Sequence, residues 1–167
     1  MDAMEKFRIA QTLPYIEGRL LDVGCGYNNL VARYGSGIGV DIYQWPGIDI
    51  LVDSISNLPF KDRCFDTVSM LAMLNHVPNR RQALSEINRI LSDSGRLLIT
   101  MIDPRTGIIA HIIFRRDHSV RGKSMGELKG MTRKNVRREL SDSGFAVIQE
   151  IPFEFGFNCL YVAKKIK

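Results

Sequence analysis

The sequence predicts an α/β domain built on a doubly wound, mostly parallel, seven-stranded sheet with an antiparallel C-terminal hairpin strand. Short apolar runs of strand length alternate with segments whose apolar residues recur at helical spacing. This alternation is typical of parallel βαβ units with right-handed crossovers. The last two apolar runs are separated only by residues 154–156, a spacing that indicates a hairpin.

The composition fits one globular domain over residues 1–167. Apolar residues make up 45% of the chain and charged residues 25%, as in ordinary folded domains. The cysteines Cys25, Cys64 and Cys159 show no metal-ligand spacing, so we expect no metal site and a reducing, cytoplasmic location. We also expect no transmembrane segment and no signal peptide, because the chain has no apolar run of 18 or more residues and no signal-peptide core.

The first third of the chain predicts one helix and three strands. An amphipathic helix is expected within residues 1–17, ending near Pro14. Strands are expected at 19–23, 38–41 and 48–52, with a short helix at 28–34 between the first two. The apolar face expected to pack the first helix on the domain consists of Met4, Phe7, Ala10 and Leu13.

The middle of the chain predicts a central strand, a helix and a further strand. Residues 64–74 are rich in apolar and β-branched side chains, which favours a buried strand. The helix that follows Pro78 has Asn79 as its expected N-cap and Gly95 as its expected C-terminal stop, and 96–102 form the next strand. The apolar face of this helix comprises Ala83, Leu84, Ile87, Ile90 and Leu91.

Periodicity weakens over residues 103–130, and regular structure is expected again from Thr132. Thr132 is placed to cap a basic helix that ends at Gly144, and strands are expected at 145–153 and 157–164. Positive charge is concentrated here: residues 103–138 hold ten lysines or arginines against three acids, a net charge of +7. The rest of the chain, with thirteen basic and fifteen acidic residues, has a net charge of −2.

The strongest local signal is a strand that runs into two glycines. Asp22 lies in that strand, and Gly24 and Gly26 follow it in the turn. Glycines let a ligand approach the backbone closely, and the start of the next helix offers unpaired N–H groups. The pattern therefore indicates a nucleoside-binding corner, although Gly-x-Gly also occurs in purely structural turns.

A second carboxylate follows the second strand. Asp41 stands where nucleotide-binding folds place an acidic side chain that accepts hydrogen bonds from ribose hydroxyls, and the alternative is a solvated turn residue. A nicotinamide dehydrogenase uses the same parts but needs a third small residue, and that position here is Asn29. Asp22 also suits a cationic amino group better than a pyrophosphate. A dinucleotide is therefore the weaker interpretation.

Several short motifs follow one another along the chain, and their order and spacing together are more specific than any one of them. They are Asp22-Val-Gly-Cys-Gly26, Gly39-Val-Asp41, Asp53 with Asn57-Leu-Pro-Phe60, Phe65-Asp-Thr-Val68, His76-Val77 and the stretch 84–98. Over about residues 18–102 the chain thereby resembles the class I S-adenosylmethionine-dependent methyltransferases, especially the small-molecule branch known as methyltransferase type 11. The resemblance implies a Rossmann-like fold and S-adenosylmethionine as the cofactor.

The resemblance also implies roles for individual residues. Gly24 and Gly26 leave room for the methionine portion of S-adenosylmethionine beside the backbone, Asp22 lies near the ammonium group of that portion, and Asp41 holds the ribose hydroxyls. The remaining cofactor contacts implied are Ile42 against adenine, Asp53 and the Ser54 N–H on its polar edge, and the Leu71 carbonyl on the methionine amino group. The chain departs from the family at Asn28, where a third glycine is common, and its segment between Gly26 and Asp41 is short.

Residues for the methyl acceptor are expected after the fourth and fifth strands. His76, with an ordinary pKa of about 6.5, is a candidate base or hydrogen-bond partner, although it could equally order its loop. His111, Arg115 and Arg116 lie in the insertion at 103–130, where related enzymes build part of the acceptor pocket. Clustered guanidinium groups favour phosphate or carboxylate, so we expect an anionic small-molecule acceptor.

Two alternatives remain open at this point. The basic segment also fits an RNA-binding methyltransferase, but it has few interleaved aromatic residues, so nucleic acid is not the expected partner. A non-catalytic, cofactor-binding protein of the same fold is the other alternative, since one scaffold hosts many functions. The apolar Ile108, Ile109, Ile112, Ile113 and Phe114 run into Arg115 and Arg116, so peripheral contact with a membrane is also considered. The sequence leaves the oligomeric state open.

Overall fold

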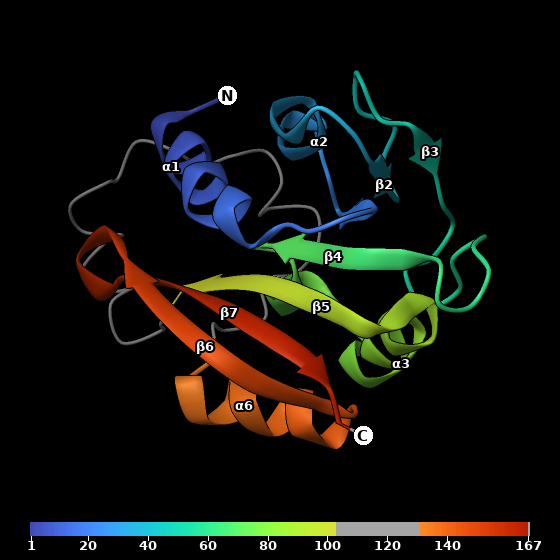
Figure 1. The fold of residues 1–167 in the computed structure, drawn as a ribbon. Helices are drawn as coiled ribbons and strands as arrows, with labels where there is room; N and C mark the ends of the chain where they lie inside the picture. Colours follow the sequence, from blue (N-terminus) through green and yellow to red (C-terminus); the bar gives the residue numbers. More distant parts are fainter. Residues whose placement is uncertain (103–130, 167) are drawn as a thin grey trace.

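The computed structural model describes residues 1–102 and 131–166, and their strands form one sheet in the order β3-β2-β1-β4-β5-β7-β6 (Figure 1). Neighbouring strands run parallel from β3 to β5, whereas β7 is antiparallel to both β5 and β6. The predicted fold class is therefore confirmed. The strands are β1 (Leu20–Val23), β2 (Ile38–Asp41), β3 (Ile50–Leu51), β4 (Phe65–Leu71), β5 (Leu91–Ile102), β6 (Phe145–Phe153) and β7 (Asn158–Lys165).

Helices cover both faces of the sheet and enclose two apolar cores (Figure 1). α3 (Arg80–Ile90) and α6 (Arg133–Asp142) share one core with strand residues such as Leu97 and Ile99. α1 (Ala3–Thr12) and α2 (Asn29–Tyr34) pack over the other, which includes Leu98. Successive strand residues thus alternate between the two cores. Short 3₁₀ turns are η1 (Leu13–Tyr15), η2 (Leu74–His76) and η3 (Glu154–Gly156).

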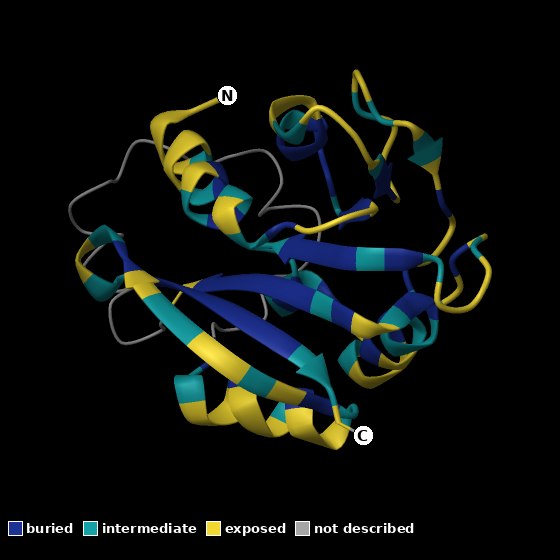
Figure 2. Ribbon diagram, in the orientation of Figure 1, coloured by how far each residue is buried: buried dark blue, intermediate teal, exposed yellow. Residues whose placement is uncertain are grey.

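Burial is deepest in the middle of the sheet, where β4, β5 and β7 are mostly dark blue in Figure 2 and every residue of β1 is buried. β6, at the edge, carries several exposed residues, and so does the outer side of α6. Over 1–102 and 131–166, no helix is both long and apolar enough to cross a membrane. The candidate acceptor insertion at 103–130 lies outside the described residues.

The expected N-caps of α3 and α6 are confirmed. The Asn79 side chain accepts from the Gln82 N–H at 3.4 Å, and the Thr132 side chain accepts from the Asn135 N–H at 3.3 Å. Gly144 follows α6 with a left-handed φ of 81°, which lets the chain leave the helix at once.

Gly95 does not stop α3, contrary to the sequence-based expectation. The helix ends at Ile90, and Leu91 adopts an extended conformation, is fully buried and pairs with Phe65. Regular pairing resumes at Arg96 after a bulge that contains Gly95. A Cβ at Gly95 would lie 2.5 Å from Leu91 Cδ2, so the glycine permits this close packing and does not cap a helix.

The predicted packing face of the first helix is wrong for three of its four residues; the fourth, Leu13, follows the helix and packs against the core. Met4, Phe7 and Ala10 are exposed, whereas Ile9 and Thr12 are buried against the domain. The buried stripe includes a threonine whose hydroxyl donates to the Arg8 carbonyl at 2.9 Å, and a pattern based on apolar residues alone misses it.

β4 is shorter than residues 64–74. It ends at Leu71 because Ala72 has a left-handed φ of 52° and turns the chain away from the sheet. The Ala72 N–H donates to the carbonyl and the hydroxyl of Thr100, at 3.2 and 2.9 Å, and these bonds hold the turn. η2, with His76 at its end, follows directly beyond the carboxyl end of β4.

Candidate active site

The carboxyl ends of four parallel strands bring the predicted cofactor residues to one edge of the sheet. Strand register places Asp22 of β1 beside Ser69 of β4, and Asp41 of β2 beside Leu51 of β3. Asp53 follows β3 by two residues, and Leu71 ends β4. This edge, where the order of strands reverses direction around β1, is where open α/β sheets bind their ligands.

The glycine turn after β1 has a backbone that only glycine adopts easily. Gly24 and Gly26 have φ values of 73° and 55°. The N–H groups of Gly24 and Cys25 both donate to the Val40 carbonyl, at 2.8 and 3.1 Å, which anchors the turn to β2. A Cβ at Gly24 would lie 2.8 Å from the Met73 side chain. The turn is therefore fixed in place, and the Met73 side chain of the β4 loop packs directly against Gly24.

Asp22 is a buried carboxyl group. Its side chain accepts a hydrogen bond from the Ser69 hydroxyl at 2.7 Å. Burial raises its pKa to about 7, the Ser69 bond opposes that shift, and the Asp41 and Glu5 carboxylates add to it. A buried acid with raised pKa gains most from a cationic partner. The site therefore fits a ligand that carries an ammonium group.

Asp41 is 6% exposed and uses both carboxylate oxygens to hold the backbone. Oδ2 accepts from the Gly26 N–H at 2.9 Å, and Oδ1 accepts from the Tyr43 N–H at 3.0 Å. A carboxylate oxygen can accept more than one hydrogen bond, so both Asp41 oxygens have acceptor capacity left for ligand hydroxyls. The two backbone bonds fix the carboxylate in position at the end of β2.

The residues expected at the adenine end lie on the solvent side of the same edge. Ile42 is 36% exposed, and Asp53 and Ser54 are exposed as well. Between them, the Val52 N–H donates to the Asp41 carbonyl at 2.9 Å and joins the end of β3 to β2. An apolar side chain and two polar groups are thus available to a flat, polar-edged ring.

His76 lies beyond the carboxyl end of β4 and is half-buried. Its Nε2 lies 3.3 Å from the Asn75 side-chain nitrogen. Its Nδ1 is buried and has no hydrogen-bond partner among the described residues. Within residues 1–102 and 131–166, the ring therefore has one polar atom without a hydrogen-bond partner.

The remaining site predictions lie outside the described part of the chain or concern metals. His111, Arg115 and Arg116 fall within 103–130, so the structure does not place them. Among the residues it describes, no group of three His, Cys, Asp or Glu side chains is arranged to hold a metal ion.

Two groups of site residues were not predicted from the sequence. One is Ser69, the partner of Asp22; a polar side chain inside an otherwise apolar strand was the available signal. The other is the contact of Asn28 with Asp49, 2.9 Å between side-chain nitrogen and carboxylate oxygen. No spacing rule connects two residues in different loops.

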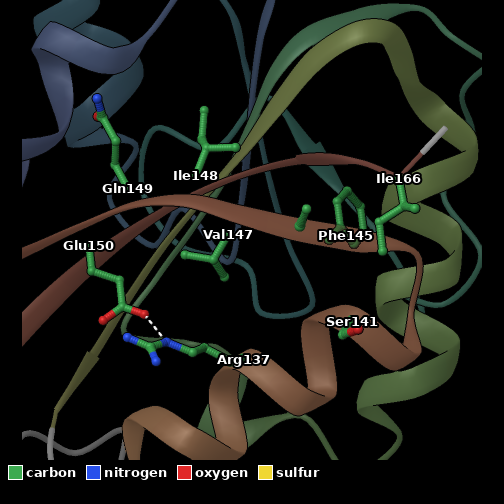
Figure 3. A pocket seen from close by; sticks show the side chains of 9 residues that line it. Arg137, Ser141, Phe145, Val147, Ile148, Gln149, Glu150 and Ile166 are labelled. Carbon is green, nitrogen blue, oxygen red and sulfur yellow. Dashed lines mark hydrogen bonds and ion pairs between the residues drawn. The ribbon is translucent and has the colours of Figure 1, made fainter.

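A separate hollow of about 490 Å³ lies between α6 and β6, the outermost strand on the side of the sheet opposite β3 (Figure 3). Arg137 and Glu150 form an ion pair across it, and the apolar side chains of Phe145 and Val147 line it. None of the predicted cofactor residues lines this hollow. The chemistry-bearing side chains are at the carboxyl ends of the parallel strands instead.

Comparison with known proteins finds the same fold, and a family model matches part of the chain. The fold is that of the S-adenosylmethionine-dependent methyltransferases. One solved structure with this fold is 1,6-didemethyltoxoflavin-N1-methyltransferase of Burkholderia thailandensis, with bound 1,6-didemethyltoxoflavin and S-adenosylhomocysteine. It superposes with a TM-score of 0.72 at 17% identity, and the match covers 99% of this chain and 79% of that one. A family model described as "Methyltransferase domain" matches residues 21–99. The resemblance inferred from the motifs is thereby confirmed.

Two curated relatives are longer than this chain. An uncharacterised protein of Methanocaldococcus jannaschii is 29% identical over 166 residues, which cover 83% of this chain and 64% of the relative. The ubiquinone/menaquinone biosynthesis C-methyltransferase UbiE of Campylobacter jejuni is 24% identical over 140 residues, or 74% of this chain and 60% of the relative. The chain thus spans somewhat less than two thirds of the length of either.

Proposed function

We propose that this chain transfers a methyl group from S-adenosylmethionine to a small-molecule acceptor. The observation that carries the proposal is the pairing of a buried carboxyl group, Asp22, with a glycine turn and a second fixed carboxylate, Asp41, at one sheet edge. A cofactor with an ammonium group at one end and ribose hydroxyls in the middle satisfies both carboxylates. A dinucleotide would instead place pyrophosphate near Asp22.

Each predicted contact has a role in this proposal. Asp22 binds the methionine ammonium while Ser69 orients its carboxylate, and Gly24 and Gly26 leave room for the methionine chain. Asp41 accepts from the ribose hydroxyls. The adenine ring lies against Ile42, with its polar edge on Asp53 and the Ser54 N–H, and the Leu71 carbonyl supports the amino group.

The cofactor, when bound, supplies a methyl group already activated on a sulfonium. The protein then has mainly to align the acceptor and exclude water. His76, whose buried Nδ1 has no hydrogen-bond partner among the described residues, is the proposed residue that holds the acceptor or takes its proton. We propose no obligatory general base, because a good nucleophile reacts once it is aligned.

The acceptor is proposed to be an anionic small molecule. The net charge of +7 over 103–138 supports an anion, and Arg115, Arg116 and His111 are the residues proposed to bind it. The C. jejuni enzyme is named for ubiquinone/menaquinone biosynthesis, and the B. thailandensis enzyme for 1,6-didemethyltoxoflavin, the small molecule bound in its structure; both names support a small-molecule acceptor.

The test is transfer of tritiated methyl from S-adenosylmethionine into separate pools of metabolites, lipids and RNA. We expect label in an anionic small molecule, and at least tenfold lower turnover when Arg115→Ala and Arg116→Ala are combined, since each arginine makes a charge-assisted contact of about 1.5–3 kcal/mol. Lys134→Ala with Arg138→Ala removes equal charge from exposed positions of α6 and is the matched control.

Label in RNA, with affinity falling steeply with salt, would replace this acceptor by nucleic acid. Full turnover in the double arginine variant would remove the anionic pocket. Cofactor binding without transfer to any pool would favour a cofactor-binding protein without catalysis.

A further inference from the structure

Two irregular segments form the ribose end of the candidate cofactor site: the glycine turn, residues 24–28, and the β2–β3 loop, residues 42–49. Next to the sheet, the Asp41 carboxylate joins them, since it accepts from Gly26 of one and Tyr43 of the other. Neither segment belongs to a helix or strand, so contacts of this kind must fix their separation.

A second junction lies farther from the sheet and depends on Asn28. Its side-chain nitrogen donates to the Gly47 carbonyl at 3.0 Å and to Asp49 Oδ2 at 2.9 Å. The same Asp49 oxygen accepts from the Gly39 N–H of β2 at 2.7 Å. Asn28 therefore ties the glycine turn both to the β2–β3 loop and, through Asp49, to β2 itself.

Packing between the same two segments supports the junction. The rings of Tyr27 and Trp45 lie 5.2 Å apart, centroid to centroid, in a tilted arrangement. Three successive residues of the turn, at positions 26, 27 and 28, thus each contact residues 41–49. The contact runs along the turn and is not confined to one point.

The local structure at Asn28 is arranged for this contact. Its backbone is left-handed, with φ 59° and ψ 28°, a conformation that asparagine tolerates better than most side chains. Asn28 occupies the N-cap position of α2, yet its side chain caps no helix N–H and turns to the loop instead. Gly39 leaves the space for it, because a Cβ there would overlap the Asn28 side-chain oxygen.

We propose that Asn28 is a positioning residue that fixes the β2–β3 loop against the glycine turn and thereby holds Asp41 in its ribose-binding position. The proposal rests on the ribose role proposed above for Asp41. It acts through Tyr43: this loop residue donates to Asp41, and the far end of its loop is held by Asn28. At the position where related enzymes often have glycine, this chain gains a link between loops.

Asn28→Gly tests the proposal, because glycine keeps the left-handed backbone and removes only the side chain. In the ligand-free protein we expect faster amide hydrogen exchange over residues 42–49. We expect the dissociation constant for S-adenosylhomocysteine to rise about tenfold, from the loss of hydrogen bonds to a charged acceptor. The KM for S-adenosylmethionine should rise more than kcat falls, a split that a general loss of folding would not give.

Arg63→Gly is the matched control, because Arg63 also has a left-handed φ, 55°, but lies in the β3–β4 loop. It should leave the affinity for S-adenosylhomocysteine unchanged. If Asn28→Gly fails to fold, Asn28→Asp keeps the size of the side chain and turns an oxygen toward Asp49, and the same weakening is expected.

Two outcomes would overturn the inference. Unchanged exchange over residues 42–49 would show that Asn28 does not hold the loop, and faster exchange with affinity within twofold of the parent would show that the loop does not serve the ribose site. Failure of the parent chain itself to bind S-adenosylhomocysteine would contradict the proposed cofactor site instead. The exchange measurement on the ligand-free protein separates the two failures.

Discussion

Asp41 has two tasks in the structure: its carboxylate holds Gly26 and Tyr43 and, in our proposal, the ribose hydroxyls. Asp41→Ala should weaken S-adenosylmethionine binding by about 1.5–3 kcal/mol, the usual range for hydrogen bonds to a charged group. Titration calorimetry measures this change. Because two backbone N–H groups also lose their acceptor, we expect a lower free energy of unfolding as well.

Asp41→Asn separates these two tasks. The amide retains one oxygen for the backbone while losing the charge, so the free energy of unfolding should fall less than in Asp41→Ala, and binding should still weaken. Unchanged cofactor affinity in both variants would remove Asp41 from the site.

Asp22 makes the stability of the ligand-free protein depend on pH. Burial raises its pKa from 3.8 to about 7, so the native state keeps a proton that the unfolded chain has already lost in that range. Stability contributed by this group therefore falls as pH rises from about 4 to about 7, and is level above. Asp22→Asn removes the effect, and its gain in melting temperature over the parent should be larger at about pH 8 than at about pH 4.

The same variant should bind S-adenosylmethionine more weakly, because the ammonium group loses its anionic partner. Parent affinity should rise with pH through about 7 as Asp22 ionises. Asp142→Asn, at an exposed position of α6, is the control and should change neither quantity. Equal melting-temperature differences at both pH values would contradict the assignment.

At this scale the sequence predicts residues that belong to a local motif. Asp22, Gly24, Gly26 and Asp41 follow from strand ends and glycine spacing. Ser69 does not, because its contact with Asp22 depends on which strands pair and in which register. The link between Asn28 and Asp49 likewise needs the path of two loops, which no periodicity encodes.

α3 stabilises the domain through its apolar stripe, in which Ile87 is fully buried. Ile87→Ala should lower the free energy of unfolding by about 2–5 kcal/mol, from lost apolar contact and a residual cavity. Ser85→Ala, on the exposed side of the same helix, should stay within about 0.5 kcal/mol of the parent. Chemical denaturation compares them, and equal losses would contradict the assigned face.

The stripe of α3 was predicted from the sequence because four apolar residues share one helical face; the fifth residue assigned to that face, Leu91, begins β5 instead. The buried face of α1 was not predicted correctly, since it includes Thr12 while the apolar Phe7 is exposed. The end of α3 was missed because Gly95 resembles a helix stop, whereas burial of Leu91 against the sheet determines where the helix ends. Tertiary packing therefore determines both the buried face of α1 and the residue at which α3 ends.

For the molecule as a whole, the alternation of strands and helices predicts a mostly parallel sheet, and the last two apolar runs predict an antiparallel hairpin. β7 lies between β5 and β6 and is antiparallel to both, so the last strand of the chain is an interior strand and β6 is the edge strand. The sequence predicts an antiparallel final strand but gives no signal for this insertion. Burial of β7 on both faces explains why it is almost wholly apolar up to Ala163.

The central claim is that the edge formed by β1, β2 and β4 binds S-adenosylmethionine. Titration calorimetry of the parent chain with S-adenosylmethionine, S-adenosylhomocysteine and NAD tests it most directly, with Asp22→Asn as the matched variant. We expect both sulfur-containing ligands to bind, NAD not to bind, and Asp22→Asn to weaken the first two. A folded parent chain that binds NAD but neither S-adenosylmethionine nor S-adenosylhomocysteine at millimolar concentration would contradict the claim.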